Sequence, residues 1–339
     1  MIVKRKSLPL KLLGLEALVK RLPEHHPAEE NLMQEIRKVR AGENGERILE
    51  SIFNKYGFPF EHYILHDLNL QSSGKFQIDT LFLSSRGAVV LEVKNIAGRI
   101  EFPQDQNQLV RVLENGQVDA FECPSVQLER NIMLLKDWFF EKGYSIPIKG
   151  AVVFPRPQQK FENVRKNLTL LFPYEIPVYL RKQKETPPSL DSKTLKAVVK
   201  DLTNDHRRYN SFPLIQNYNI QRAELVPGIR CEKCATHGMQ TIHSGWGCKS
   251  CGHVDKLAHI QALLEYCMLV DFQFTNKDIR NFFRTDNKDR VSRILKHLEI
   301  PSIGEKRGVK YAVGLRDLER LFDVQKGRPQ EMLRQAIVR

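Results

Sequence analysis

Two short apolar runs, at residues 76–84 and 87–94, dominate the hydrophobic pattern of the first half of the chain. Both are rich in residue types that favour strands, and only Ser85 and Arg86 separate them. Two strand-like runs joined by two turn-type residues predict a β-hairpin. Strands of this kind are also expected at residues 150–154 and 176–180.

The register of this hairpin would bring charged side chains together. With Ser85 and Arg86 as the loop, counting outward places Asp79 directly across from Glu92, and paired side chains have Cβ atoms roughly 4.5–5.5 Å apart. Lys94 follows Glu92 by two residues and therefore points to the same face. Two carboxylates and one ammonium group are thus expected in one small area. A slip of one residue would turn them to opposite faces.

These charged groups have the chemistry of a metal-dependent phosphodiester hydrolase. Charges at the end of an apolar strand are costly unless something compensates them. Mg²⁺ or Mn²⁺, held by oxygens of Asp79, Glu92 and the Val93 carbonyl, would do so and would activate water. Lys94 would then stabilise the pentacovalent phosphate or position the attacking water. The alternative is a surface Glu–Lys pair beside an aspartate that closes a strand.

Two amphipathic helices are predicted on either side of the hairpin in the sequence. Residues 44–53 carry a helical apolar stripe that puts Glu46 at the helix N-terminus, where a carboxylate also favours the helix dipole. A second helix, from Ser125 to Phe140, has Gln127 in its first turn. Its apolar stripe is expected to pack on the sheet and consists of Leu128, Ile132, Leu135 and Phe139. Helix-end electrostatics and an ordinary polar first-turn position also explain Glu46 and Gln127.

Several of these segments, in this order, resemble the nuclease-related domain, NERD, of the restriction-endonuclease-like PD-(D/E)xK superfamily. The resemblance covers about residues 40–180 and rests on Gly45-Glu46-Arg47, Gln77-Ile78-Asp79, Leu91-Glu92-Val93-Lys94-Asn95 and Gly98. It implies a mixed sheet flanked by helices, with Glu46 from an early helix and Asp79, Glu92 and Lys94 from the hairpin. It also implies that Gln127, on the helix after Cys123-Pro124, lies near the site. Ile78 stands where the superfamily name has proline.

The composition indicates a folded protein with a polyanionic partner. A chain of 339 residues is long enough for two or three domains, and its net charge is +13. No apolar run approaches the length of a membrane span, which favours nucleic acid, in particular DNA, over a membrane as the partner. The basic residues near the N-terminus fit either an arm lying on phosphates or a solvated helix. Without a recognisable secretory signal, we expect a cytoplasmic protein, and the sequence indicates no oligomeric state.

The cysteines form a metal-binding pattern. Two Cys-x-x-Cys pairs, Cys231 with Cys234 and Cys248 with Cys251, match the spacing of a four-thiolate zinc site. A redox Cys-x-x-Cys motif would not explain the second pair. Since four thiolates complete a tetrahedral shell, we expect one structural Zn²⁺ in a zinc ribbon. The other two cysteines, Cys123 and Cys267, are expected to be buried thiols.

The chain after the cysteines is helical and basic. Helices are predicted at residues 259–272, 277–283 and 288–298, followed by a hairpin at 301–313, an order that resembles a winged helix-turn-helix. In that motif the third helix enters the major groove and the hairpin touches phosphates. The expected nucleic-acid contacts are Arg290, Arg293, Lys296, Lys306 and Arg307. The alternative is a small helical domain with a solvated basic face, since winged helices also bind proteins.

Together these patterns predict an α/β nuclease-like domain followed by two small modules. The expected divisions are a basic helical segment (1–39), the nuclease-like domain (40–204), a linker (205–229), the zinc ribbon (230–255), the winged-helix-like domain (256–316) and a basic helical tail (317–339). The leading hypothesis is a metal-dependent nuclease held on DNA by its C-terminal modules. The rivals are a non-catalytic nucleic-acid-binding regulator and an adaptor whose C-terminal module docks on another protein.

Overall fold

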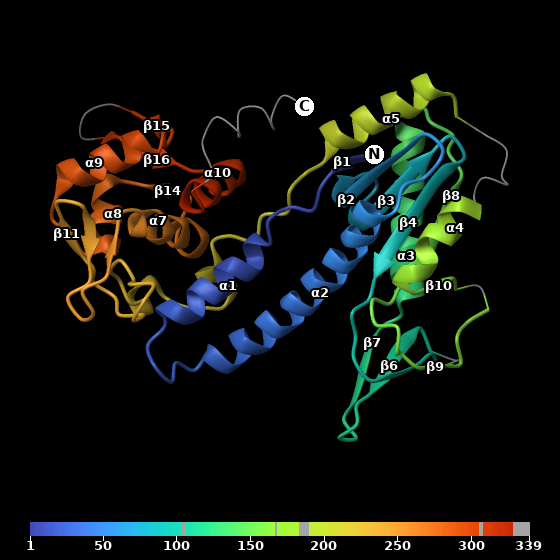
Figure 1. Cartoon of the computed structure of the whole chain (residues 1–339), viewed down its shortest axis with the longest axis horizontal. Helices are drawn as coiled ribbons and strands as arrows, with labels where there is room; N and C mark the ends of the chain where they lie inside the picture. The colour runs from blue at the N-terminus through green and yellow to red at the C-terminus, as the bar shows by residue number, and fades with distance from the viewer. Residues whose placement is uncertain (104–105, 167, 183–189, 305–307, 328–339) are drawn as a thin grey trace. The chain divides into compact units, whose positions relative to one another are not determined.

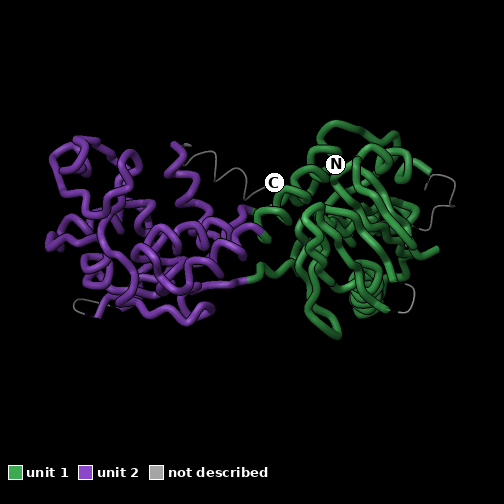
Figure 2. Tube along the Cα trace, turned by 90° about the horizontal axis from the view of Figure 1, so that it is seen from below, with its two compact units in different colours: residues 1–7, 38–209 green, residues 8–37, 210–339 purple. Residues whose placement is uncertain are grey.

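A computed structural model describes residues 1–103, 106–166, 168–182, 190–304 and 308–327 (Figure 1). The chain divides into two compact units, shown in different colours in Figure 2. Unit 1 comprises residues 1–7 and 38–209, and unit 2 comprises residues 8–37 and 210–339. Helix α2 (Glu29–Lys55) contributes residues to both units.

Unit 1 is built on a six-stranded mixed sheet with the order β1-β2-β3-β4-β8-β10. Its strands are β1 (Ile2–Lys4), β2 (His62–Gln71), β3 (Lys75–Ser84), β4 (Gly87–Val93), β8 (Ile148–Val153) and β10 (Leu170–Leu171). The three strands β2, β3 and β4 form an antiparallel meander, whereas β1, β8 and β10 run parallel to their neighbours. The mixed α/β architecture expected from the sequence is therefore present.

The hairpin of β3 and β4 has the register that its two-residue loop predicts. Ser84 pairs with Gly87, and the ladder continues without a slip to Thr80 opposite Leu91. Gly87 has a φ of 119°, a conformation that favours glycine at this turn. The regular ladder ends just before Asp79 and Glu92, so these two carboxylates lie at the open end of the hairpin.

Helices bury both faces of this sheet. One face is covered by the second half of α2, through Leu49 and Phe53, and by α4 (Ile176–Lys182). The other face is covered by α3 (Pro124–Glu141) and α5 (Ser192–Asp205). The predicted stripe of α3 is confirmed, because Leu128, Leu135 and Phe139 are all buried in that core.

Three expectations about local structure are wrong. Residues 176–180 form helix α4 and not a strand. Just before this helix, Glu175 accepts a hydrogen bond from the Phe172 amide. Pro177 lies in the first turn of the helix, where its missing N–H costs little. The first residues form the parallel strand β1 and not a helix. Helix α2 begins at Glu29 and continues through two glycines, so Glu46 lies inside a long helix and not at its N-terminus.

A second sheet follows β4 in the chain and has the order β7-β6-β5-β9. Its strands are β5 (Arg99–Glu101), β6 (Gln108–Val112), β7 (Val118–Glu122) and β9 (Phe161–Glu162). Because β5 starts soon after β4 ends and β9 follows β8, this sheet begins near the end of β4 that carries Glu92.

Unit 2 contains helix α1 (Leu10–Arg21), a small sheet with the four-cysteine cluster in the segments around its strands, and a helical module. The small sheet consists of β11 (Gln240–Ile242), β12 (Gly245–Gly247) and β13 (Val254–Asp255). The module contains α7 (Ala258–Leu269), β14 (Gln273–Phe274), α8 (Asn276–Phe283), α9 (Lys288–His297), β15 (Ser302–Ile303), β16 (Lys310–Ala312) and α10 (Leu315–Gln325). Thr275 caps α8 by accepting a hydrogen bond from the Asp278 amide.

The segment at residues 205–229, expected to be a linker, contains α6 (Leu214–Asn217) and a 3-10 helix (Arg222–Glu224). None of the described helices has both the length and the apolar character that crossing a membrane requires.

Candidate functional site

The centre of the candidate site is Glu92, a buried carboxylate next to the last residue of β4. Only 2% of Glu92 is exposed. Its Oε1 accepts a hydrogen bond from Gln127 Nε2 at 2.5 Å, and its Oε2 accepts one from Asn131 Nδ2 at 3.4 Å. Both partners lie on α3, one turn apart, so the helix that covers this face also positions the carboxylate.

Lys94 completes a closed set of polar contacts. Its Nζ lies 3.2 Å from Glu92 Oε1 and donates to Gln127 Oε1 at 2.5 Å. Gln127 therefore bridges the carboxylate and the ammonium group, which is where the sequence resemblance places it. Asn131 also donates to the Gln77 carbonyl at 2.9 Å and so ties α3 to β3. Sequence reasoning missed Asn131, although a polar residue one turn after Gln127 on an apolar face was a signal for it.

Asp79 lies on β3 at the end of the hairpin ladder and is half-buried. Its Oδ2 accepts a hydrogen bond from the Val93 amide at 2.7 Å, so the carboxylate reaches across to the backbone beside Glu92. Burial, together with the charges of Glu92 and Glu46, raises the pKa of Asp79 well above its usual value. Burial also raises the pKa of Glu92 in spite of the opposing charge of Lys94. Ionisation of both carboxylates is therefore disfavoured unless a further cation compensates it.

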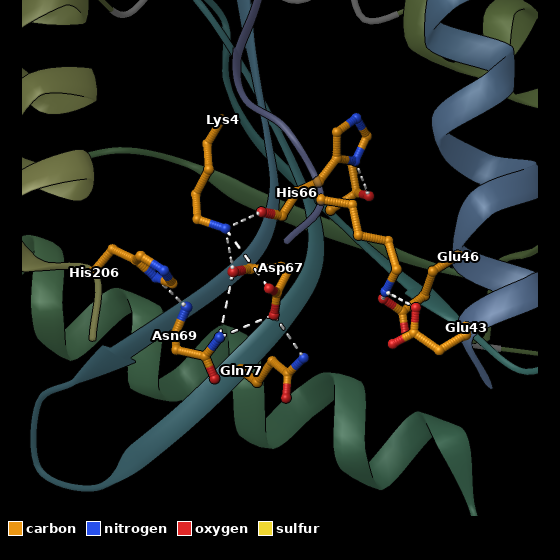
Figure 3. Close-up of polar contacts among 10 residues, drawn as sticks. Lys4, Glu43, Glu46, His66, Asp67, Asn69, Gln77 and His206 are labelled. Atoms are coloured by element: carbon orange, nitrogen blue, oxygen red, sulfur yellow. Dashed lines mark hydrogen bonds and ion pairs between the residues drawn. The ribbon is translucent and has the colours of Figure 1, made fainter. Parts of the chain in front are cut away.

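Glu46 approaches this group from α2, but its direct partner is a lysine that the sequence did not single out. The ammonium group of Lys6 forms an ion pair with Glu46 and lies 3.2 Å from Oε2 of Glu43. Figure 3 shows Glu43 and Glu46 at this contact. Burial raises the pKa of Glu46, while Lys6 opposes that rise. The Lys6 side chain is only 10% exposed, so Lys6 fits neither the arm lying on phosphates nor the solvated helix expected for the basic residues near the N-terminus.

The close approach of α2 to the end of β4 depends on Gly45. A Cβ atom at this position would lie 2.9 Å from Asn95 Cβ and 3.0 Å from Val93 Cγ1, closer than side chains normally pack. Asn95 Nδ2 also donates to the Ala41 carbonyl at 2.7 Å. The helix is thus held directly against the residues that flank Lys94.

A polar network on β2 and β3 supports the position of Asp79 (Figure 3). Asp67 has a φ of 51° and falls between the pairs His66–Thr80 and Leu68–Ile78, opposite Asp79. The Lys4 ammonium donates to the carbonyls of His66 and Asp67, each at 2.8 Å. The carboxylate of Asp67 accepts from Asn69 at 3.0 Å and from Gln77 at 3.1 Å. These contacts hold the irregular part of the strand pair from which Asp79 projects.

The acidic residues do not form a closed metal cage. Among the residues that the structure describes, only the four cysteines form a group of three or more Cys, His, Asp or Glu side chains whose ligand atoms all lie within 4.8 Å of one another. Mg²⁺ commonly takes one or two protein carboxylates and keeps several waters. Asp79 and Glu92, which lie at the same end of the β3–β4 hairpin, offer the carboxylate oxygens that such an ion prefers.

The four cysteines Cys231, Cys234, Cys248 and Cys251 form a cluster in unit 2 that could hold a metal ion. The sulfur atoms of Cys231 and Cys251 lie 3.7 Å apart, and those of Cys234 and Cys248 lie 3.5 Å apart. Four thiolates around a zinc ion, with Zn–S bonds of about 2.3 Å, have sulfurs separated by roughly these distances. The remaining cysteines, Cys123 and Cys267, are buried, as predicted.

The expected nucleic-acid contacts on α9 differ in their surroundings. Arg293 and Lys296 are exposed. Arg290 instead donates to the carbonyls of Ile242 at 3.2 Å and Gly245 at 2.7 Å, and it lies over the Trp246 ring. Arg290 therefore holds α9 against the β11–β12 hairpin. The expectation that its side chain is directed away from the protein toward nucleic acid does not fit these contacts. Lys306 and Arg307 lie outside the described residues.

Comparison with protein families matches residues 41–155 to NERD, the nuclease-related domain. The matched span includes Glu46, Asp79, Glu92, Lys94 and Gln127. It covers less than half of the chain and leaves Lys6 outside. Neither the curated proteins nor the solved structures provided a match. The chain thus carries a nuclease-related domain, with a four-cysteine cluster beyond it.

Proposed function

We propose that unit 1 is a cytoplasmic, metal-dependent nuclease of the restriction-endonuclease-like type that hydrolyses phosphodiester bonds in DNA. The observation that carries this proposal is the contact set of Glu92, Gln127 and Lys94 beside Asp79. Buried carboxylates that outnumber the ammonium groups beside them are costly to a fold and are a common mark of functional sites. Their place within the matched nuclease-related domain supports the same conclusion.

The carboxylates of Asp79 and Glu92 would hold Mg²⁺ or Mn²⁺. When bound there, such an ion would lower the pKa of a water ligand and neutralise charge on a phosphoryl oxygen. Gln127 fixes the Glu92 carboxylate and, through its carbonyl oxygen, the ammonium group of Lys94. Lys94 is the more exposed partner of this pair, with 22% of its side chain accessible, and is suited to meet a phosphate oxygen. Glu46, held by Lys6, would orient the attacking water.

A cleavage assay tests this proposal. Plasmid, linear duplex, single-stranded DNA and RNA are incubated with the protein and Mg²⁺ or Mn²⁺, alongside Asp79→Ala, Lys94→Ala and the exposed control Glu129→Ala. We expect metal-dependent cutting that falls on the order of 10²–10³-fold in the first two variants only. Equal cutting by all proteins would indicate a contaminant or another site. Binding without cutting would favour the regulatory alternative.

We also propose that unit 2 holds the nucleic acid through a zinc ribbon and a winged-helix-like module. The order helix, strand, two helices and two strands, with the three strands in one antiparallel sheet, supports the second assignment. Arg293 and Lys296 on α9 are two of its exposed cationic side chains. Replacing Arg293 with Ala should reduce the salt slope of DNA affinity by about one. An unchanged slope would remove this helix from the DNA-binding surface.

A further inference from the structure

A basic hollow lies in unit 1, between the second sheet and the segment that follows β8. Its volume is about 520 Å³, and its lining includes Arg99, Arg156, Lys160 and one acidic residue, Glu114. Arg156 and Lys160 are exposed. Arg99 is paired with Glu162 at 2.9 Å, so Arg156 and Lys160 are the cations best suited to an incoming anion.

The residues that line the hollow follow β4 and β8, the two strands whose ends lie beside Lys94. Strands β4 and β8 are parallel and end together, with Val93 opposite Val153. The Lys94 amide donates to the Val153 carbonyl at 2.9 Å. The residues that follow two parallel strands lie close together when the strands end in register. Ligands of such sheets commonly bind at these carboxyl ends of the strands. Lys94 and the segment that leads to Arg156 therefore leave the sheet at the same end.

Specific contacts hold the basic residues in place. Arg156 Nε donates to Asn95 Oδ1 at 3.1 Å, directly after Lys94 in the chain. This bond fixes the plane of the guanidinium group, whose terminal nitrogens form the fork that matches a phosphate. Gln159 donates to the carbonyl of Gly98, which anchors the segment after β8. Gly98 has a φ of 92°, and a Cβ there would lie 2.6 Å from the Val112 carbonyl oxygen, so this turn requires glycine.

We propose that this hollow is a phosphate subsite in which Arg156 and Lys160 bind a backbone phosphate of the strand being cut, next to the phosphodiester that Lys94 meets. The inference rests on the proposed nuclease function. Both residues lie just beyond the 41–155 match. The substrate is accordingly a nucleic-acid strand that extends past the scissile bond, and a single nucleotide diester cannot use the subsite.

Binding without cleavage tests the subsite separately from the chemistry. In an Asp79→Ala background, affinity for a fluorescein-labelled oligonucleotide is measured by anisotropy over a range of salt concentrations. The Arg156→Gln/Lys160→Gln change should weaken binding and reduce the salt slope by about 1.5–2, because two phosphate contacts are lost. Lys193→Gln/Lys200→Gln, which removes two exposed lysines of α5, is the charge-matched control. An unchanged slope, or an equal change in the control, would overturn the proposal.

Kinetics and a competing anion provide the second arm. In the cutting enzyme, KM should fall as the oligonucleotide lengthens from two to six nucleotides, and the double variant should lose this dependence, with KM rising more than kcat falls. Inorganic phosphate should compete with the oligonucleotide only weakly. If phosphate binds the hollow tightly and the oligonucleotide fails to displace it, the site belongs to a free anion and the inference fails. If the wild type cuts nothing, the nuclease proposal fails while the anisotropy result still decides the subsite.

Discussion

The ammonium group of Lys6 forms ion pairs with Glu46 and Glu43, which lie in a segment distant from Lys6 in the sequence. Lys6 follows β1, whereas both glutamates belong to α2. Together, burial and these ion pairs leave the pKa of Lys6 raised: burial lowers it, but Glu46 and Glu43 outweigh that effect. Lys6 is therefore cationic at every pH at which Glu46 titrates, and a fragment limited to residues 41–155 would lack this cation.

Removing Lys6 should shift the pH dependence of activity. Burial raises the pKa of Glu46, and the charges of Glu43 and Asp67 raise it as well, whereas Lys6 lowers it. The change Lys6→Met should therefore raise the pKa of Glu46 further. Glu46 would then stay protonated to a higher pH, and the acidic limb of the pH–rate profile should move upward. Lys6→Arg keeps the charge and should keep the limb. A uniform loss of rate in Lys6→Met with no shift of the limb would contradict this role for Lys6.

Replacing Asp79 with Asn should stabilise the metal-free protein at neutral pH. The folded-state pKa of Asp79 is raised, so its contribution to stability is present below the unfolded-state pKa and is lost as the pH rises through the folded-state pKa. Asn keeps an oxygen for the Val93 amide but carries no charge. A stabilisation of about 1 kcal/mol would raise Tm by about 2–4 °C in thermal melts with EDTA.

The same variant should lose stabilisation by metal. A divalent ion at 100 times its Kd adds about 2.7 kcal/mol to the free energy of unfolding. The wild type should therefore melt at a higher temperature in Mn²⁺ than in EDTA, and Asp79→Asn should show little difference. An equal Mn²⁺ effect in both proteins would place the ion elsewhere.

Gln127→Ala should lower activity by about 10–100-fold, the usual cost of losing a residue that orients a metal-binding group. The amide contacts both Glu92 and Lys94, so its loss frees two side chains of the site. Initial rates at saturating substrate measure the effect, with Glu129→Ala on the same helix as the control. Equal rates for the two variants would show that Gln127 is an ordinary polar residue of α3.

Two glycines of α2 offer a matched comparison. A methyl group at Gly45 would press on Asn95 and Val93, whereas a Cβ at Gly42 would meet nothing within 4 Å. Gly45→Ala should destabilise the protein by about 1–3 kcal/mol and reduce activity, because α2 must move away from the end of β4. Gly42→Ala should stabilise it by about 0.5–1 kcal/mol, as in an ordinary helix interior. Denaturant unfolding of both variants tests the expectation, which fails if they behave alike.

Zinc should be present at about one equivalent per chain by elemental analysis. Cys248→Ser removes one thiolate of the cluster and should release the metal and destabilise unit 2, because structural zinc contributes directly to folding. Cys267→Ser, at a buried cysteine outside the cluster, should retain the zinc. A wild-type protein without zinc would refute the zinc-ribbon assignment.

The sequence predicted those features that depend on local spacing. The two-residue loop at Ser85 and Arg86 determined the hairpin register, and the Cys-x-x-Cys pairs predicted the cysteine cluster. The position of Glu46 was misjudged because the helix was predicted only over residues 44–53, where its apolar stripe lies, whereas α2 begins at Glu29. Gly45 within it is needed for contact with another element. Lys6 was missed because the pairing of β1 with β2 joins segments far apart in the chain. Nothing in its neighbours distinguishes it from a solvated basic residue.

The two sides of the candidate site differ in how freely they can change during evolution. Glu92 and Lys94 are fixed by a strand that is packed on both faces and by a turn that permits no insertion without a slip in register. Arg156 and Lys160 follow β8 outside the sheet, in a connection that can gain or lose residues without disturbing the carboxylates. Divergence in substrate preference among such domains should therefore arise in the connection after β8, while the hydrolytic chemistry is inherited unchanged.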